Sequence, residues 1–254
     1  MKRAAILTAF AVCMLAALMA VPSAAQEVVS EAANWRDQAL QSLTWRGTPL
    51  SLNTEGGFEQ TERISLCVRF NNYGCVKQGS SPWDGSDGRR DDKGHAVFKD
   101  PAYSVRAVVR DYCSKHRRGL RSAADIAAAY SPWCDTLGSV AVKDQWARSC
   151  SDDPRPPADF AGPVCQKPEG EPSDAQCGSC NCPSRIASQW LNGLVIDDAQ
   201  IRPADDLKLF DAQGQPNEAV LSIVLKNKML IELGGFQPTT AVVERGIELA
   251  GVCR

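Results

Sequence analysis

The stretch MLIELGGFQPTTAVV, residues 229–243, contains the end of one apolar segment and the start of another. The apolar residues upstream of it have helical spacing, which predicts a helix over 217–233. Two adjacent glycines then end that helix, and a second helix is predicted over 239–250. The only acidic residue of the quoted stretch, Glu232, lies just before the glycines. The sequence therefore places a carboxylate at the end of a helix whose last turns are apolar.

Glu232 shares one face of the predicted helix with Leu221, Leu225 and Lys228, which precede it by eleven, seven and four residues. We therefore expect the carboxylate beside apolar side chains and not on a plain solvent face. Partly buried carboxyl groups serve many glycan-cleaving enzymes as proton donors. Two interpretations stay open: Glu232 is a catalytic acid, or it is an ordinary charge at a helix end.

Other helix signals occur along the chain, and strand signals are weak. Asp100 and Pro101 form a typical helix start, and Ser122 with Asp125 resembles a capping box. A short hairpin is the most that the segment 83–97 predicts. We therefore expect a mostly α fold. The further helices are predicted over 35–43, from 101 to the stop at Gly119, from 122 to the stop at Pro132, over 136–148 and over 184–194.

The segment 151–183 differs in composition from the rest, because it holds seven of the fifteen prolines and four cysteines. Such a segment favours neither helix nor strand, so we expect an insertion that disulfides hold in place. The predicted organisation is a signal peptide (1–25), an N-terminal extension (26–60), a helical half with Asn71 and Asn72 (61–150), the Pro/Cys-rich insertion (151–183) and a C-terminal helical half with Glu232 (184–254).

The first residues have the pattern of a secretory signal peptide. Lys2 and Arg3 precede an apolar segment over 4–21, and small residues suited to cleavage precede position 26. A short membrane anchor is the alternative, because the apolar segment is barely short of a span. We expect cleavage and export, to the periplasm or the outside of a bacterial cell, with no membrane attachment afterwards.

Ten cysteines remain once the predicted signal peptide, which contains Cys13, is removed. An even number in an exported chain favours disulfides, here about five, whose connectivity the sequence leaves open. The alternative is a metal site at the cluster 177–182, but neither histidine has ligand spacing to it, and we expect no metal. The ten are Cys67, Cys75, Cys113, Cys134, Cys150, Cys165, Cys177, Cys180, Cys182 and Cys253.

Charge and composition argue against several functional classes. Removal of Lys2 and Arg3 takes the formal net charge from −2 to −4, so no basic excess suggests a nucleic-acid partner. With only two histidines, a Ser-His-Asp triad has no support. No glycine-rich phosphate loop occurs, and we expect no cofactor.

Two stretches, 69–136 and 229–252, together resemble a family of phage and prophage proteins that are often labelled structural proteins. Members begin with an Arg-Asn-Asn-Asn-Pro-Gly-Asn-Ile motif and carry His-Glu-Asn-Gly before a final helix that ends in Leu-Ala-Gly-Val. The resemblance covers roughly residues 64–252, with the cysteine-rich segment inserted. The corresponding positions are Asn71-Asn72-Tyr73-Gly74, Trp83 with Gly85, Ala96-Val97-Phe98, Gly119-Leu120, Tyr130-Ser131-Pro132-Trp133 and Ile231-Glu232-Leu233-Gly234.

The same stretches resemble parts of lysozyme-like glycosidases. The segment 232–238 is similar to the Glu-Ser-Gly helix end and following turn of transglycosylases, and 71–77 is similar to an Asn-Asn-x-Phe-Gly-Ile-Lys motif of bacterial glucosaminidases. In those enzymes the glutamate precedes the asparagines, so a circular permutation would reconcile the two orders. The resemblance implies a lysozyme-like helical domain in which Glu232 and Asn71-Asn72 lie close together, because groups around one glycosidic bond sit within about 10 Å of each other. A gap above about 15 Å would contradict it.

This resemblance implies an enzyme that cleaves peptidoglycan glycan strands, as a muramidase or a lytic transglycosylase does. Glu232 would be the catalytic acid, and the substrate-binding residues would be Asn71, Asn72, Tyr73 and Gly234. The alternative is a non-catalytic, phage-derived structural or glycan-binding protein, because Ile231 and Leu233 replace the family's histidine and asparagine. A disulfide-rich factor aimed at another cell is a third interpretation. Candidates for a second catalytic carboxylate are Glu55, Glu59, Glu62 and Asp84.

Overall fold

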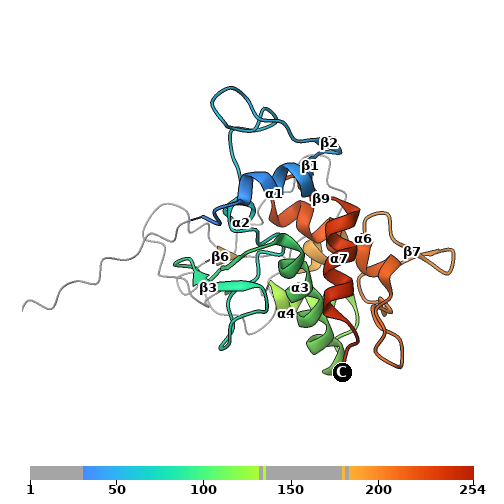
Figure 1. Cartoon of the computed structure of the whole chain (residues 1–254). Helices are drawn as coiled ribbons and strands as arrows, with labels where there is room; N and C mark the ends of the chain where they lie inside the picture. The colour runs from blue at the N-terminus through green and yellow to red at the C-terminus, as the bar shows by residue number, and fades with distance from the viewer. Residues whose placement is uncertain (1–30, 132–133, 136–178, 181–182) are drawn as a thin grey trace, which may run out of the picture.

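The computed structural model describes residues 31–131, 134–135, 179–180 and 183–254, and it has a mixed α/β fold (Figure 1). The described residues are 40% helical and 16% strand, so the predicted mostly α, lysozyme-like helical fold is wrong. The strands are two to five residues long, and the central sheet joins segments far apart in the chain. Such strands lack the alternating pattern that identifies a strand locally.

Except for the short helix α2, which was not predicted, the described helices begin and end close to the predicted positions. Two of the predicted starts rest on capping residues, which act locally. Asp100 accepts a hydrogen bond from the backbone N–H of Ala102 at 2.7 Å, with Pro101 in the first helical position. Ser122 accepts one from the N–H of Asp125 at 3.1 Å. These predicted starts are confirmed. The helices are α1 (Trp35–Ser42), α2 (Leu66–Arg69), α3 (Pro101–Arg117), α4 (Ala123–Tyr130), α5 (Pro183–Trp190), α6 (Glu218–Glu232) and α7 (Thr240–Ala250).

The strands form one three-stranded and three two-stranded antiparallel sheets among the described residues. The hairpin expected within 83–97 is present, as the pair β3–β4. In the central sheet β1 pairs with β2 on one side and with β9 on the other. The strands are β1 (Leu43–Trp45), β2 (Thr48–Pro49), β3 (Ser86–Arg90), β4 (Ala96–Phe98), β5 (Cys134–Asp135), β6 (Ser179–Cys180), β7 (Val195–Ile196), β8 (Ala199–Gln200) and β9 (Phe236–Pro238).

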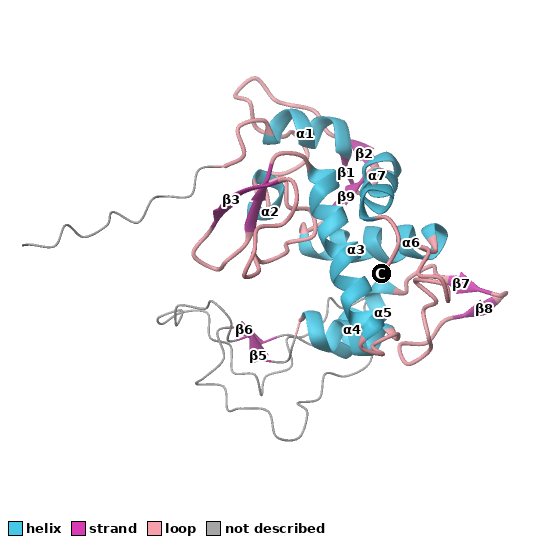
Figure 2. Cartoon of the chain, turned by 60° about the horizontal axis from the view of Figure 1, so that its bottom comes forward, coloured by secondary structure: helices cyan, strands magenta, loops and turns pink. Residues whose placement is uncertain are grey.

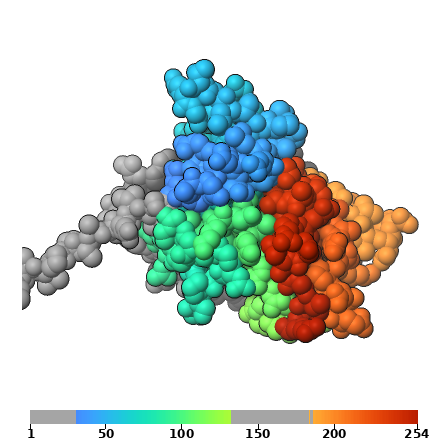
Figure 3. All heavy atoms as spheres, in the orientation of Figure 1, coloured from blue at the N-terminus to red at the C-terminus, as the bar shows by residue number. Residues whose placement is uncertain are grey.

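The central sheet brings the two ends of the described chain together. Trp45 lies opposite Phe236, and their rings meet edge to face with centroids 4.9 Å apart. In Figure 3 the N-terminal segment and helix α7 lie next to each other on the face shown. The N-terminal extension predicted over 26–60 is therefore, where it is described, part of the same body as the C-terminal helices.

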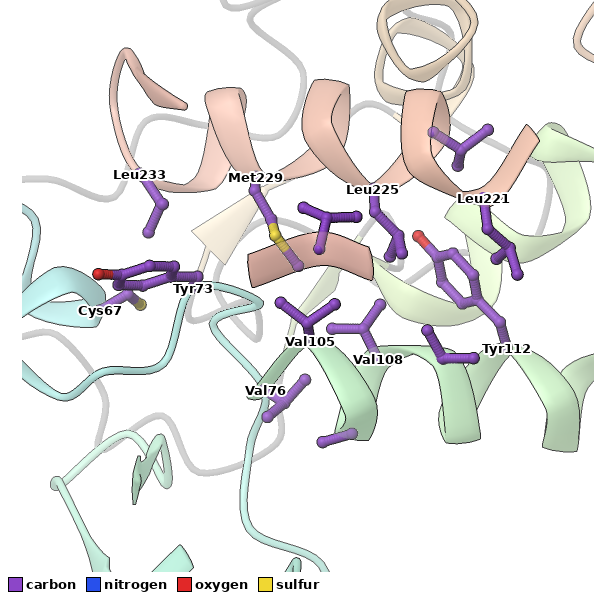
Figure 4. Packing of buried hydrophobic residues seen from close by; sticks show 14 of the residues in the cluster. Cys67, Tyr73, Val76, Val105, Val108, Tyr112, Leu221, Leu225, Met229 and Leu233 are labelled. Carbon is purple, nitrogen blue, oxygen red and sulfur yellow. The ribbon is translucent and has the colours of Figure 1, made fainter. Parts of the chain in front are cut away.

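The core lies between α3, α6 and α7. Figure 4 shows the apolar face of α6, with Leu221, Leu225 and Met229, turned toward the apolar face of α3. Helix α7 packs closely on α3 because Gly246 has no side chain: a Cβ there would lie 2.4 Å from the Cβ of Val105. On the other side of the molecule α4 packs against α5, and the β7–β8 hairpin extends away from them (Figure 2). The described parts of both predicted halves thus share one hydrophobic core.

Two of the predicted disulfides are present in the described part of the chain. Cys67 is bonded to Cys75, and Cys113 on α3 is bonded to Cys253 at the C-terminus. Cys134 and Cys180 are backbone partners in the β5–β6 pair. The expected bonds of Cys150, Cys165, Cys177 and Cys182 lie outside the described residues.

Several other predictions fall outside the described ranges as well: the signal peptide over 1–25, the helix over 136–148 and most of the insertion over 151–183. Among the helices that the structure describes, none has both the length and the apolar character needed to cross a bilayer.

Candidate functional site

An open cleft of about 560 Å³ lies where the end of α6 meets α3, α4, α5 and the loop that follows α2. Its wall includes the Cys67–Cys75 disulfide, two aromatic side chains and several charged ones. Aromatic faces beside carboxylates and lysines form a surface that suits a polar ligand with apolar faces, such as a sugar ring. The residues that line it are Cys67, Cys75, Val76, Lys77, Trp83, His95, Asp111, Lys115, Ala129, Tyr130, Ser131, Ile186, Ile231 and Glu232.

Glu232 lies in the wall of this cleft. It is the last residue of α6, and its side chain keeps 26% of its surface exposed. The backbone turns away immediately afterwards, at Gly234 and Gly235, which both have positive φ. The predicted placement of Glu232 on a partly apolar helix face is confirmed, because Leu221 and Leu225 on that face are fully buried.

Lys228 connects Glu232 to the loop that carries the asparagines. It is fully buried, and its Nζ donates a hydrogen bond to the carbonyl oxygen of Gly74 at 2.8 Å. The same Nζ lies 3.6 Å from a carboxylate oxygen of Glu232 and 4.1 Å from the ring centre of Tyr130. Burial lowers the pKa of Lys228, whereas the charge of Glu232 acts to raise it. Through Lys228, the loop that contains Asn71 and Asn72 and the end of α6 are therefore neighbours.

A second lysine–carboxylate pair lies on the other side of Tyr130. Lys115 and Asp111, one turn apart on α3, are 2.5 Å apart, and the Nζ of Lys115 is 5.5 Å from the Tyr130 ring centre. The Tyr130 hydroxyl donates to the carbonyl oxygen of Gly74 at 2.6 Å. Burial raises the pKa of Tyr130 well above its usual value, and the charge of Glu232 adds to this, so the hydroxyl stays protonated. The cleft floor is thus a network of two ion pairs around a neutral tyrosine.

Asp111 is a carboxylate of the cleft that the sequence reasoning missed. The four earlier candidates for a second acid do not line the cleft: Glu55, Glu59 and Glu62 are exposed elsewhere, and Asp84 pairs with Arg106. The i, i+4 spacing of Asp111 and Lys115 on a predicted helix was the available signal, but such pairs are common on ordinary helix surfaces.

Asn72 holds the loop between α2 and the hairpin in place and does not contact the cleft. Its side chain is fully buried, and its Nδ2 donates to the carbonyl oxygens of Val76 and Ala96, both at 2.9 Å. Its Oδ1 accepts a hydrogen bond from the N–H of Val76 at 2.9 Å. Asn72 therefore forms hydrogen bonds with backbone groups of two segments, and its buried side chain is not accessible to a sugar.

Asn71 and Tyr73 are also fully buried. The Asn71 amide donates to Oδ1 of Asn34 at 2.9 Å, and the Tyr73 hydroxyl shares a hydrogen bond of 2.7 Å with Ser42. Burial raises the pKa of Tyr73, so this hydroxyl too stays neutral. Gly234 is exposed but is not among the cleft residues. Of the residues predicted to bind substrate, none lines the cleft, and the three buried ones position its wall.

His95 reaches the cleft from the turn of the β3–β4 hairpin. Its Nδ1 lies 2.8 Å from a carboxylate oxygen of Asp91, whose side chain is 6% exposed. Beside it, the Trp83 indole donates to the carbonyl oxygen of Lys77 at 2.9 Å, so the ring is held against the cleft rim. Trp83 belonged to the family resemblance, whereas His95 had no predicted role.

His116, the other histidine, lies away from the cleft and packs edge to face on Phe210, with ring centres 5.3 Å apart. Burial lowers its pKa, and Arg121 adds to the effect. Its contribution to stability is therefore present above the unfolded-state pKa of about 6.5 and is lost as the pH falls toward the folded-state value. We expect wild type to lose more stability than His116→Gln in urea unfolding between pH 8 and pH 5. Identical pH slopes for both proteins would contradict this assignment.

No group of three or more His, Cys, Asp or Glu side chains that could hold a metal ion occurs within the described ranges. No protein-family model matches the chain, and no curated protein matches it either.

Proposed function

We propose that this protein is an exported glycosidase that cleaves peptidoglycan glycan strands, with Glu232 as the general acid. The observation that carries the proposal is the position of Glu232: a partly exposed carboxylate at the end of a buried helix, in the wall of an open cleft. A sugar ring entering there would lie beside Trp83 and Tyr130, the two aromatic side chains among the cleft residues. The two disulfides fit the oxidising environment outside the cytoplasm or in the periplasm, where this substrate is found.

The buried loop supports the proposal through positioning. Lys228 contacts the Glu232 carboxylate and the Gly74 carbonyl at once, and the sulfur of Cys75 lies 3.7 Å from the Glu232 carbonyl oxygen. Both the side chain and the backbone of Glu232 therefore hold the end of α6 against the loop. A general acid has to be fixed within hydrogen-bond reach of the oxygen that it protonates, and these contacts provide such fixing.

The test is the release of soluble fragments from purified sacculi by the full exported chain with its disulfides formed. We expect turbidity to fall and new sugar ends to appear in the soluble fraction. An intact, folded protein that releases no fragments under any buffer condition would end the proposal.

A second candidate is a non-catalytic glycan-binding protein of the cell envelope, derived from the phage-type family. The ion pair between Lys228 and Glu232 favours it, because a carboxylate held by a buried ammonium also serves a purely structural purpose. Co-sedimentation with sacculi without fragment release, and equal binding by Glu232→Gln, would favour this candidate over the enzyme.

A further inference from the structure

The β3–β4 hairpin ends in a turn that fixes the orientation of His95. One oxygen of Asp91, Oδ1, accepts hydrogen bonds from the backbone N–H groups of Lys93 at 3.0 Å and His95 at 2.7 Å. The N–H of Gly94 also donates to the Asp91 carbonyl oxygen, at 3.0 Å. These bonds satisfy the turn without the second carboxylate oxygen. That oxygen, Oδ2, lies 2.8 Å from Nδ1 of His95.

The contact with Asp91 determines which imidazole nitrogen of His95 can take up a proton. A carboxylate only accepts hydrogen bonds, so Nδ1 of His95 carries the hydrogen and Nε2 is the nitrogen that can take up a proton. The Asp91 side chain is 6% exposed and that of His95 is 20% exposed, so the buried carboxylate holds a ring that reaches the cleft. The turn does not need the contact between Asp91 and His95. A histidine whose ring is oriented by a carboxylate has the arrangement of a general base.

His95 and Glu232 are linked by one short piece of chain. Cys75 contacts the backbone of Glu232, and Lys77 forms a β-bridge with His95. Both side chains also line the same cleft. The two carboxyl groups of an inverting glycosidase lie about 6.5–9.5 Å apart, with room for a water molecule between them. An acid–base pair formed by Glu232 and His95 would likewise have to hold a water molecule between them in this cleft.

We propose that His95, oriented by Asp91, is the general base that activates water in this cleft, opposite Glu232 as the acid. This inference rests on the proposed glycosidase function. The water oxygen forms the new bond to the anomeric carbon, and its proton passes to Nε2 of His95. The glycosidic bond breaks, its electron pair leaves with the departing oxygen, and Glu232, which starts this step as a protonated carboxyl group, donates its proton to that oxygen. Solvent then returns the proton from His95 to Glu232, and the product has a reducing end.

The test compares three variants with wild type on purified sacculi, with reducing ends as the readout. We expect His95→Gln to lower kcat about 10²–10⁴-fold while sacculus binding is retained. Asp91→Asn keeps an oxygen for the turn but places an NH₂ group against Nδ1, which moves the ring hydrogen to Nε2. We expect a loss of the same order from it. His116→Gln, at the histidine outside the cleft, should keep wild-type activity.

Rescue by imidazole separates a base from a structural role. We expect free imidazole to restore part of the activity of His95→Ala, which only a missing proton acceptor explains. If wild type cleaves sacculi and folded His95→Gln cleaves them equally well, this inference is overturned and the proposed function stands. His95→Ala that loses activity, is less stable than wild type and is not rescued by imidazole would also overturn it, because His95 would then have a structural role. Wild type that cleaves nothing would overturn both.

Discussion

Replacing Glu232 with glutamine is expected to slow fragment release from sacculi by about 10²–10⁴-fold, the usual contribution of a general acid. Glutamine has the same shape, but its amide cannot protonate the leaving oxygen. Lys228 loses the charged partner at 3.6 Å and keeps its hydrogen bond to the Gly74 carbonyl. We expect a stability loss of about 1–3 kcal/mol, because a buried polar group that loses a partner costs an amount in this range. Initial rates and urea unfolding measure the two effects.

The matched control is Glu244→Gln, on the exposed side of α7 and outside the cleft residues. It removes the same charge from the protein and should change neither rate nor stability by a measurable amount. If wild type cleaves sacculi and Glu232→Gln cleaves them at the same rate, the acid lies elsewhere. Asp111, the other carboxylate of the cleft, would then be the next candidate.

Replacing Asn72 with alanine is expected to lower the free energy of unfolding by about 3–5 kcal/mol. The change leaves the buried N–H of Val76 and the carbonyl of Ala96 without their side-chain partner, and each such loss costs about 1–3 kcal/mol. The disulfide between Cys67 and Cys75 still closes the loop, so the variant should fold with a loosened cleft wall. Urea unfolding monitored by tryptophan fluorescence measures the change.

Asn192→Ala, at an exposed asparagine after α5, serves as the control and should stay within about 0.5 kcal/mol of wild type. The experiment also separates two roles for Asn72. Unchanged stability together with weakened sacculus binding would mean that Asn72 contacts the glycan, as the sequence resemblance implied. The structure instead predicts that Asn72→Ala lowers the free energy of unfolding and that any loss of sacculus binding is a consequence of this lower stability.

The helices were predictable because their ends depend on neighbouring residues. Asp100 caps α3 two residues away, and Ser122 caps α4 three residues away, so each interaction is visible in the local sequence. The central sheet was not predictable, since β1 and β9 are short and pair across almost the whole described chain. Their hydrogen bonds join two segments that are distant in the chain, and no local pattern encodes such a pairing.

The candidate site also has features that were predictable from the sequence and features that were not. Helical periodicity alone placed Glu232 on one face with Lys228, and the structure has them 3.6 Å apart. The resemblance to glycosidases implied Asn72 as a sugar contact, whereas its side chain is fully buried in the structure. Whether a side chain is buried depends on the segments packed over it, here the hairpin strand β4 that supplies the Ala96 carbonyl.

By itself, the sequence determined the described helices other than α2, the caps of α3 and α4 and the face of α6 that ends in Glu232, because these features depend on residues within one or two turns of each other. Only the tertiary structure decided which side chains surround Glu232. The cleft takes Asp111 and Lys115 from α3, Tyr130 from α4 and His95 from the hairpin, and it buries the asparagines beneath its wall. The physical reason is that burial and long-range hydrogen bonding are properties of packed elements, and they arise only when distant parts of the chain exclude water together.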